Sequence, residues 1–206
     1  MKKIISLAVM AAFASMLLSC EKTDKGVDMG LSVNWSDRNL DATSESDTGN
    51  FYGRGTEGFF RREKVEISQD INTKNIAGTN LDPVHKKLGG KWRMPTIAEF
   101  KELFEKCKST FDTVNNMVGI RFTAANGNNI FIPFTGEYYV SLDNNSLGTD
   151  GYYMVADHDF TRDANTETPI KFGISNDSLP SMEVWGMTSG MFGLTVRPVY
   201  DENIKE

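Results

Sequence analysis

Between residues 96 and 107 the apolar side chains recur every three or four positions, which predicts an amphipathic helix with one face in the core. Thr96 and Glu99 have the spacing of a capping box, in which a threonine hydroxyl and a glutamate carboxylate accept hydrogen bonds from free backbone N–H groups at the helix start. The apolar stripe consists of Ile97, Phe100, Leu103, Phe104 and Cys107.

Alternating apolar and polar residues predict strands in other parts of the chain. Residues 27–35 read as a first strand. Residues 120–134 read as a hairpin that turns at Asn126 and Gly127, because both residue types accept a positive φ. In its second strand Ile130, Ile132 and Phe134 should face the core. Further strands are expected within 136–142, 151–156, 170–174 and 194–200.

Polar residues dominate residues 36–80, where Asp, Ser, Thr, Asn and Gly predict long loops with only short strands. A short helix should follow over 82–88. Asp82 would cap this helix and Pro83 would lie in its first turn, while Gly89 and Gly90 would end it.

The N-terminus carries a pattern typical of secretion. Lys2 and Lys3 precede an apolar run over 4–18 that is too short for a comfortable membrane span, so residues 1–19 read as a removed signal peptide. The run ends in Leu17-Leu18-Ser19-Cys20, which resembles a bacterial lipobox. The resemblance implies that Cys20 is lipidated, that residues 20–26 form a tether and that residues 27–206 form the folded domain.

Charge and cysteine content narrow the function classes. The formal net charge of −6 becomes −8 once Lys2 and Lys3 are removed, and no dense Lys/Arg stripe remains to bind nucleic acid. Membrane association would therefore depend on the lipid. With Cys20 acylated, Cys107 has no intramolecular disulfide partner and is expected to be a buried, inert thiol rather than a nucleophile.

Four segments occur in an order that resembles the Fibrobacter succinogenes major paralogous domain family: 27–35, 89–96 followed by Glu99 and Phe100, 126–133 and 196–199. The Trp-Arg-Met-Pro-Thr sequence at 92–96 is also similar to motifs of C-type-lectin-like folds. The resemblance implies an α+β fold: a C-type-lectin-like domain with two helices, short antiparallel strands and a long loop region. Relatives are commonly surface-directed lipoproteins with no assigned reaction, so a function must still be argued from a site.

Departures from the related proteins argue against copper-dependent oxidation and against calcium-dependent sugar binding. Many relatives have a cysteine at the position of Arg38, and the resemblance implies that it forms a disulfide with the helix cysteine that corresponds to Cys107. This chain cannot form that disulfide. Formylglycine-generating enzymes of this fold type hold copper with two cysteines, and Cys107 is alone. Calcium-dependent lectins use a proline with a carboxylate or amide residue on each side of it, and none of the six prolines of this chain has such neighbours on both sides. We therefore expect no cofactor and no resident metal, although the polar loops at 143–150 and 157–159 contain oxygen ligands that also favour turns.

Aromatic residues near polar loops are the remaining candidates for a binding surface. Trp185 lies in a Gly, Ser and Met-rich segment before the last strand, and tryptophan and tyrosine rings can stack on sugars or anchor a protein interface. We name Trp185, Tyr152, Asp157 and His158 as candidate ligand-binding residues. The alternative is that the tyrosines Tyr138, Tyr139, Tyr152 and Tyr153, together with Trp185, pack the domain.

These observations predict a lipid-anchored outer-membrane protein, on the cell surface or on the periplasmic face, that is not an enzyme and binds a glycan or an envelope protein through its C-terminal loops. The alternative is a structural or assembly component of a surface complex. A hydrolase is a third, weaker hypothesis, because Asp157-His158-Asp159 could supply an acid or base while no nucleophile is evident beside it.

Overall fold

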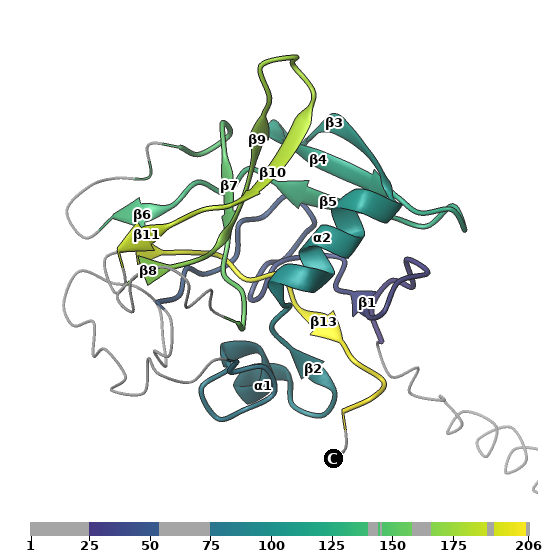
Figure 1. Ribbon diagram of the computed structural model, residues 1–206, viewed down its shortest axis with the longest axis vertical. Helices are drawn as coiled ribbons and strands as arrows, with labels where there is room; N and C mark the ends of the chain where they lie inside the picture. The colour runs from purple at the N-terminus through teal and green to yellow at the C-terminus, as the bar shows by residue number, and fades with distance from the viewer. Residues whose placement is uncertain are drawn as a thin grey trace, which may run out of the picture.

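The computed structural model describes residues 25–53, 75–139, 144, 146–157, 166–188 and 192–204 (Figure 1). Within these ranges the chain forms two helices and five small sheets, and every strand pair in the sheets is antiparallel. This is a mixed organisation compatible with the expected α+β class.

The N-terminal part contains one short strand. The two helices follow, and most of the strands come after them. Their bounds are β1 Asn34–Trp35, α1 Pro83–Leu88, β2 Trp92–Arg93, α2 Ile97–Lys106, β3 Lys108–Val114, β4 Met117–Thr123, β5 Asn129–Pro133, β6 Tyr138–Tyr139, β7 Gly151–Tyr153, β8 Thr166–Glu167, β9 Ile170–Ile174, β10 Pro180–Val184, β11 Met187–Thr188, β12 Phe192–Gly193 and β13 Val199–Tyr200.

Both helices begin at the caps that the sequence predicts. The Asp82 side chain accepts hydrogen bonds from two amides of the first turn of α1, and Pro83 lies at its start. In α2 the capping box is complete, with Thr96 accepting from the Glu99 amide and the Glu99 carboxylate accepting from the Thr96 amide. Cys107 ends α2 as a buried C-cap, as expected for an inert thiol.

The predicted hairpin forms as β4 and β5, with Ile130, Ile132 and Phe134 all buried. Its turn differs from the expectation, because only Gly127 has a positive φ, of 87°. The Gly127 amide donates to Ala124 O and the Ala124 amide donates to Asn128 O, so the loop is longer than a two-residue turn. One left-handed residue after an ordinary turn satisfies the twist of the two strands, so Asn126 need not adopt that conformation.

The expected first strand over 27–35 is wrong in its extent. The Val27 and Trp35 backbones exchange both hydrogen bonds, at 2.7 and 3.0 Å, so this segment doubles back on itself and only Asn34–Trp35 forms a strand. The cause is local: Asp28 Oδ1 accepts from the Gly30 amide, and Gly30 has a φ of 66°. Residues 36–53 and 75–80 form no regular strand, only single bridges, in agreement with the predicted loops.

The segment assigned to the tether is described at two residues, and both contact the fold. Lys25 Nζ forms an ion pair of 2.9 Å with Glu202 near the other end of the chain. A Cβ on Gly26 would lie 2.7 Å from Trp35 O, so the backbone approaches closely here. Lys25 and Gly26 are therefore packed against the domain that was expected to begin at Val27.

One sheet positions the candidate site. It has the order β10-β9-β7, and its inner face packs on α2 through Phe100, Tyr153 and Phe172, whose rings lie 5.7 to 6.0 Å apart. This face belongs to a core that also contains Trp35 and Phe122. A second core cluster, with Val84, Met94, Leu194 and Val196, includes Tyr152 from the opposite face of β7.

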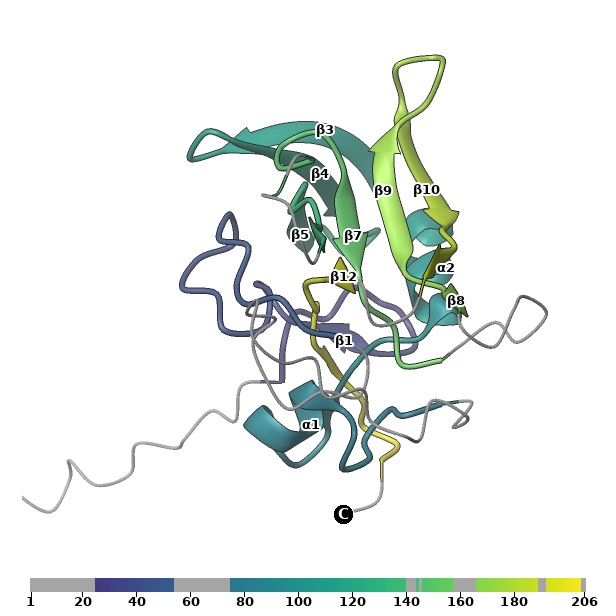
Figure 2. The same cartoon turned by 90° about the vertical axis from the view of Figure 1, so that its left-hand side faces the viewer.

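The β9–β10 hairpin extends beyond the rest of the molecule (Figure 2). In both views its turn and the C-terminal end lie at opposite ends of the molecule (Figures 1 and 2). No helix in the described part of the chain is long and apolar enough to cross a membrane.

Candidate functional site

Tyr152 and Trp185, both expected in the site, lie on the same outer face of the β10-β9-β7 sheet. Tyr152 on β7 is directly opposite Lys171 on β9, which in turn is opposite Glu183 on β10. Residues directly opposite in antiparallel strands point to the same face, as do residues two apart on one strand. The Trp185 amide continues the pairing by donating to Pro169 O at 2.9 Å, which places its side chain on the face of Glu183.

Lys171 is the centre of this cluster. Its Nζ lies 4.5 Å from the centroid of the Trp185 ring and 5.7 Å from the centroid of the Tyr152 ring, within the range of cation–π attraction. The same nitrogen is 3.5 Å from Asp150 Oδ1 and 3.8 Å from Glu183 Oε1. We call these five residues the Lys171 cluster.

Exposure differs sharply between the two aromatic residues of the Lys171 cluster. Trp185 is 38% exposed, whereas Tyr152 is buried. Burial raises the pKa of the Tyr152 hydroxyl above its ordinary value, and the nearby charges of Glu137, Asp150 and Glu183 raise it further. The Tyr152 side chain therefore stays neutral, and Trp185 supplies the accessible aromatic surface.

Glu137 borders the Lys171 cluster and was not identified from the sequence. Gly136 and Gly151 form a parallel bridge, and the Gly136 amide donates to Asp150 O at 2.8 Å, so residue 137 lies beside β7. Glu137 Oε2 is buried and has no hydrogen-bond partner among the described residues. Burial raises the pKa of this carboxyl; the charge of Lys171 lowers it and that of Asp150 raises it.

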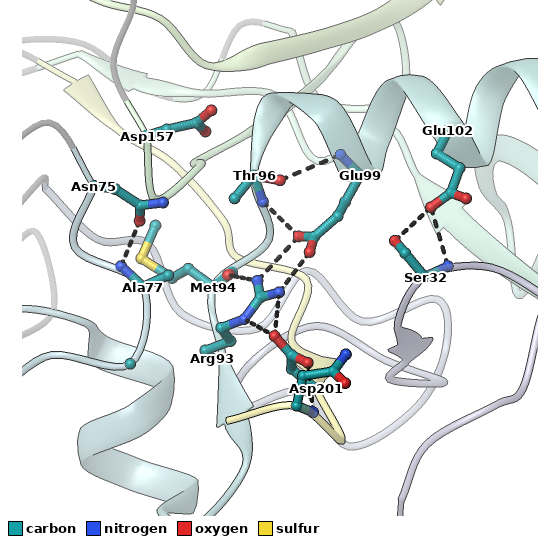
Figure 3. Close-up of polar contacts among 12 residues, drawn as sticks. Ser32, Asn75, Ala77, Arg93, Met94, Thr96, Glu99, Glu102, Asp157 and Asp201 are labelled. Atoms are coloured by element: carbon teal, nitrogen blue, oxygen red, sulfur yellow. Dashed lines mark hydrogen bonds and ion pairs between the residues drawn. The ribbon is translucent and has the colours of Figure 1, made fainter. Parts of the chain in front are cut away.

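Asp157 lies near the start of α2 (Figure 3). Its Oδ1 accepts a hydrogen bond of 2.8 Å from the Ile97 amide. Its backbone forms an isolated bridge with Asn75. A carboxylate at a helix N-terminus is favoured by the free amides there, so this contact gives Asp157 a structural role. The structure does not place Asp157 in the Lys171 cluster. His158 and Cys20 lie outside the described residues.

The other tyrosines divide between core and surface. Tyr153 is fully buried, and its hydroxyl donates to Pro133 O at 2.7 Å. Tyr138 is exposed and its ring lies 4.6 Å from that of Phe51. Tyr139 belongs to β6, where it pairs with Phe192. Neither Tyr153 nor Tyr138 contacts Lys171 in the way that Tyr152 does.

The segment 92–96, which carries the resemblance to C-type-lectin-like folds, has a structural explanation in a buried ion-pair network (Figure 3). The Arg93 guanidinium binds the Glu99 carboxylate of the capping box and lies 2.8 Å from Asp201 Oδ2. It also donates to Met94 O at 2.9 Å. Arg93 thus joins β2, the start of α2 and the end of β13, and all its contacts are internal.

A concave feature is lined by residues outside the Lys171 cluster. It is a surface groove of about 460 Å³ between the 36–42 segment, Leu88, Trp92 and Pro198. Its charged groups already have partners within the chain: Asp37 pairs with Arg38, and Asp41 accepts from Lys87 at 2.6 Å. No residue expected in the site from the sequence lines this groove.

The Lys171 cluster therefore combines an exposed aromatic ring, an ammonium group and two carboxylates at a three-stranded sheet. In the part of the chain that the structure describes, no three His, Cys, Asp or Glu side chains are grouped to hold a metal ion. Comparison with protein-family models, curated proteins and solved structures found no match for this chain.

Proposed function

We propose that this chain is a lipid-anchored outer-membrane protein of the cell envelope, with a C-type-lectin-like domain of the Fibrobacter succinogenes major paralogous type, that binds a glycan through the Lys171 cluster and catalyses no reaction. The observation that carries the proposal is the position of Trp185, which is exposed and held against a lysine on the outer face of a sheet. The lipobox and the family resemblance support the location and the fold.

A glycan suits this surface chemically. A tryptophan ring presents a flat apolar face, which can stack on the C–H side of a sugar, while charged groups around it can bind the hydroxyls at the edge of the ring. Lys171 supplies a donor, and Asp150 and Glu183 supply acceptors that each lie within 4 Å of the Lys171 Nζ. The sheet holds these groups in register, which limits the entropy lost on binding.

The position of the chain ends supports an orientation. Lys25, five residues after the proposed lipid attachment site, is bound to Glu202, and the C-terminal end lies opposite the turn of the β9–β10 hairpin (Figures 1 and 2). An anchor at Cys20 would therefore hold the C-terminal end near the membrane and leave the hairpin turn pointing away. Metabolic labelling with a fatty acid, which Cys20→Ser should abolish, tests the anchor.

Binding of the full mature chain in detergent to an array of immobilised glycans tests the main proposal. Trp185→Ala should abolish the signal on any glycan that the wild type binds. Phe111→Ala is the matched control, because Phe111 is an aromatic residue with 37% exposure on β3, in a different sheet. Equal binding by wild type and Trp185→Ala would refute the site, and release of sugars from a bound glycan would refute the non-enzymatic part.

An assembly role is the second candidate, favoured by the turn of the β9–β10 hairpin. Ile174 and Leu179 flank this turn with exposures of 60% and 62%, more than any other large hydrophobic residue described. Two exposed apolar side chains on a projecting hairpin suit contact with another protein. Under this hypothesis Ile174→Ser with Leu179→Ser should remove a stoichiometric partner from solubilised membranes, and Trp185→Ala should not.

A further inference from the structure

The charges around Lys171 are unbalanced. One ammonium group faces Asp150 at 3.5 Å and Glu183 at 3.8 Å, and the Glu137 carboxyl interacts electrostatically with both Lys171 and Asp150. Among the residues that the structure describes, three carboxyl groups therefore surround a single cation. Since the charges of neighbouring groups add, the field at this face is negative wherever the carboxyls are ionised.

Hydrogen-bonding capacity is unbalanced in the same direction. Ionised carboxylates only accept, so Asp150 and Glu183 present acceptors beyond what Lys171 can satisfy. Among the described residues Glu137 Oε2 is buried without a partner, and a buried acceptor without a donor is unfavourable in the free protein. Rotation of this half-buried carboxyl toward a donor on a ligand would relieve that cost.

Trp185 defines where such a ligand would lie. Lys171 approaches its ring at 4.5 Å, so the lysine holds the indole while 38% of the residue remains exposed. A sugar stacked on that exposed surface would place its hydroxyl groups near the carboxylates that flank Lys171. An acidic sugar in the same place would bring its carboxylate against Glu183 and Asp150.

We infer that the Lys171 cluster binds glycans that are rich in hydrogen-bond donors and carry no negative charge, that is, neutral sugars or amino sugars. The cluster rejects acidic sugars, and Glu137 accepts a hydrogen bond from the ligand. This inference rests on the proposed function, because it names the ligand class of the same site. It predicts a selectivity determined by three named carboxyl groups.

The test is a set of calorimetric titrations of the full mature chain with three probes: a neutral β-glucan oligomer, a chitosan oligomer and an oligogalacturonate. We expect the neutral or the amino sugar to bind at least about tenfold more tightly than the acidic one. Tighter or equal binding of the oligogalacturonate would overturn the inference while leaving glycan binding intact. Failure of every probe to bind would instead refute the proposed function and this inference together.

Two variants make the test specific to these residues. Glu183→Gln removes a charge from an exposed side chain, so the fold should persist while discrimination against the oligogalacturonate falls severalfold. Glu105→Gln on the exposed side of α2 is the matched control and should leave the ratio unchanged. Glu137→Gln should weaken binding of the preferred probe; unchanged affinity would refute the role of Glu137.

Discussion

The ammonium group of Lys171 on β9 lies 4.5 Å from the centre of the ring of Trp185, which directly follows β10. The contact follows from strand register. Lys171 is opposite Glu183, and Trp185 follows two residues later on the same face. A residue in a polar, Gly-rich segment is thereby given a fixed position on a sheet.

Replacing Lys171 with Met should release Trp185 while keeping the volume of the side chain. The cation–π contact is worth about 0.5–1 kcal/mol at an exposed site, so the free energy of unfolding should fall only slightly. The emission of Trp185 should change, because its charged neighbour is lost, and glycan binding should weaken. Lys171→Arg, which keeps a cation above both rings, should preserve the emission. Identical spectra for wild type and Lys171→Met would contradict the contact.

Glu137→Gln should stabilise the protein at neutral pH. Burial raises the pKa of Glu137 in the folded state, so the folded protein holds its proton more tightly than the unfolded chain does. Wild-type stability should therefore be lost as the pH rises from the ordinary carboxyl pKa through the raised one. Below that window the wild type and the variant should be equal.

Urea unfolding of wild type and Glu137→Gln at pH 4 and pH 7 measures this difference. A variant that gains stability while it loses glycan affinity would show that the buried carboxyl is maintained for binding rather than for folding. Lower stability of the variant at pH 7 would be inconsistent with an unpartnered Glu137 oxygen.

Asp82→Ala should be strongly destabilising. The fully buried Asp82 carboxylate accepts from the amides of Gly78, Val84, His85 and Met94 at 2.8 to 3.2 Å. Alanine would leave four N–H groups without this acceptor, and we expect a loss of about 2–4 kcal/mol. Asp177→Ala, at an exposed position in the β9–β10 turn, should change stability little. Comparable urea midpoints for the two variants would contradict the role of Asp82.

Arg93→Met should also be strongly destabilising, because it leaves the largely buried carboxylates of Glu99 and Asp201 without their buried cation. Breaking a buried ion pair by removing one partner costs about 3–5 kcal/mol. Lys106→Met, which breaks the exposed ion pair with Glu102, is the control and should have a small effect. If thermal unfolding of Arg93→Met matched that of the control, the Arg93 network would not be a main support of the fold.

Much of the helical structure could be predicted from local sequence, because the signals act within a few residues. The capping box of α2 and the Asp82-Pro83 start of α1 are complete within one turn. The strands β3 and β10 were not predicted, since Lys108–Val114 and Pro180–Val184 bury few side chains and show little apolar alternation. These two segments become strands because they pair with β4 and β9, and that pairing cannot be recognised from their own residues.

The candidate site was predictable only in part, for a similar reason. Trp185 and Tyr152 are recognisable as aromatic residues near polar segments, but the sequence does not indicate that Lys171 and Glu137 lie beside them. A signal was present in β9, where Lys171 interrupts the apolar pair Ile170 and Phe172 and must therefore point to the other face. For Asp157 the sequence does not distinguish a ligand residue from one that accepts a hydrogen bond at a helix start, because both use the same carboxylate chemistry.

The central claim is that Trp185 contacts the ligand, and its own fluorescence tests this most directly. A neutral or amino-sugar oligomer is titrated into the full mature chain and into Trp185→Phe, with Phe111→Ala as the aromatic control. We expect a saturable emission change for the wild type and for Phe111→Ala, and none for Trp185→Phe. A saturable change that persists in Trp185→Phe would show that the ligand binds elsewhere and would refute its contact with Trp185.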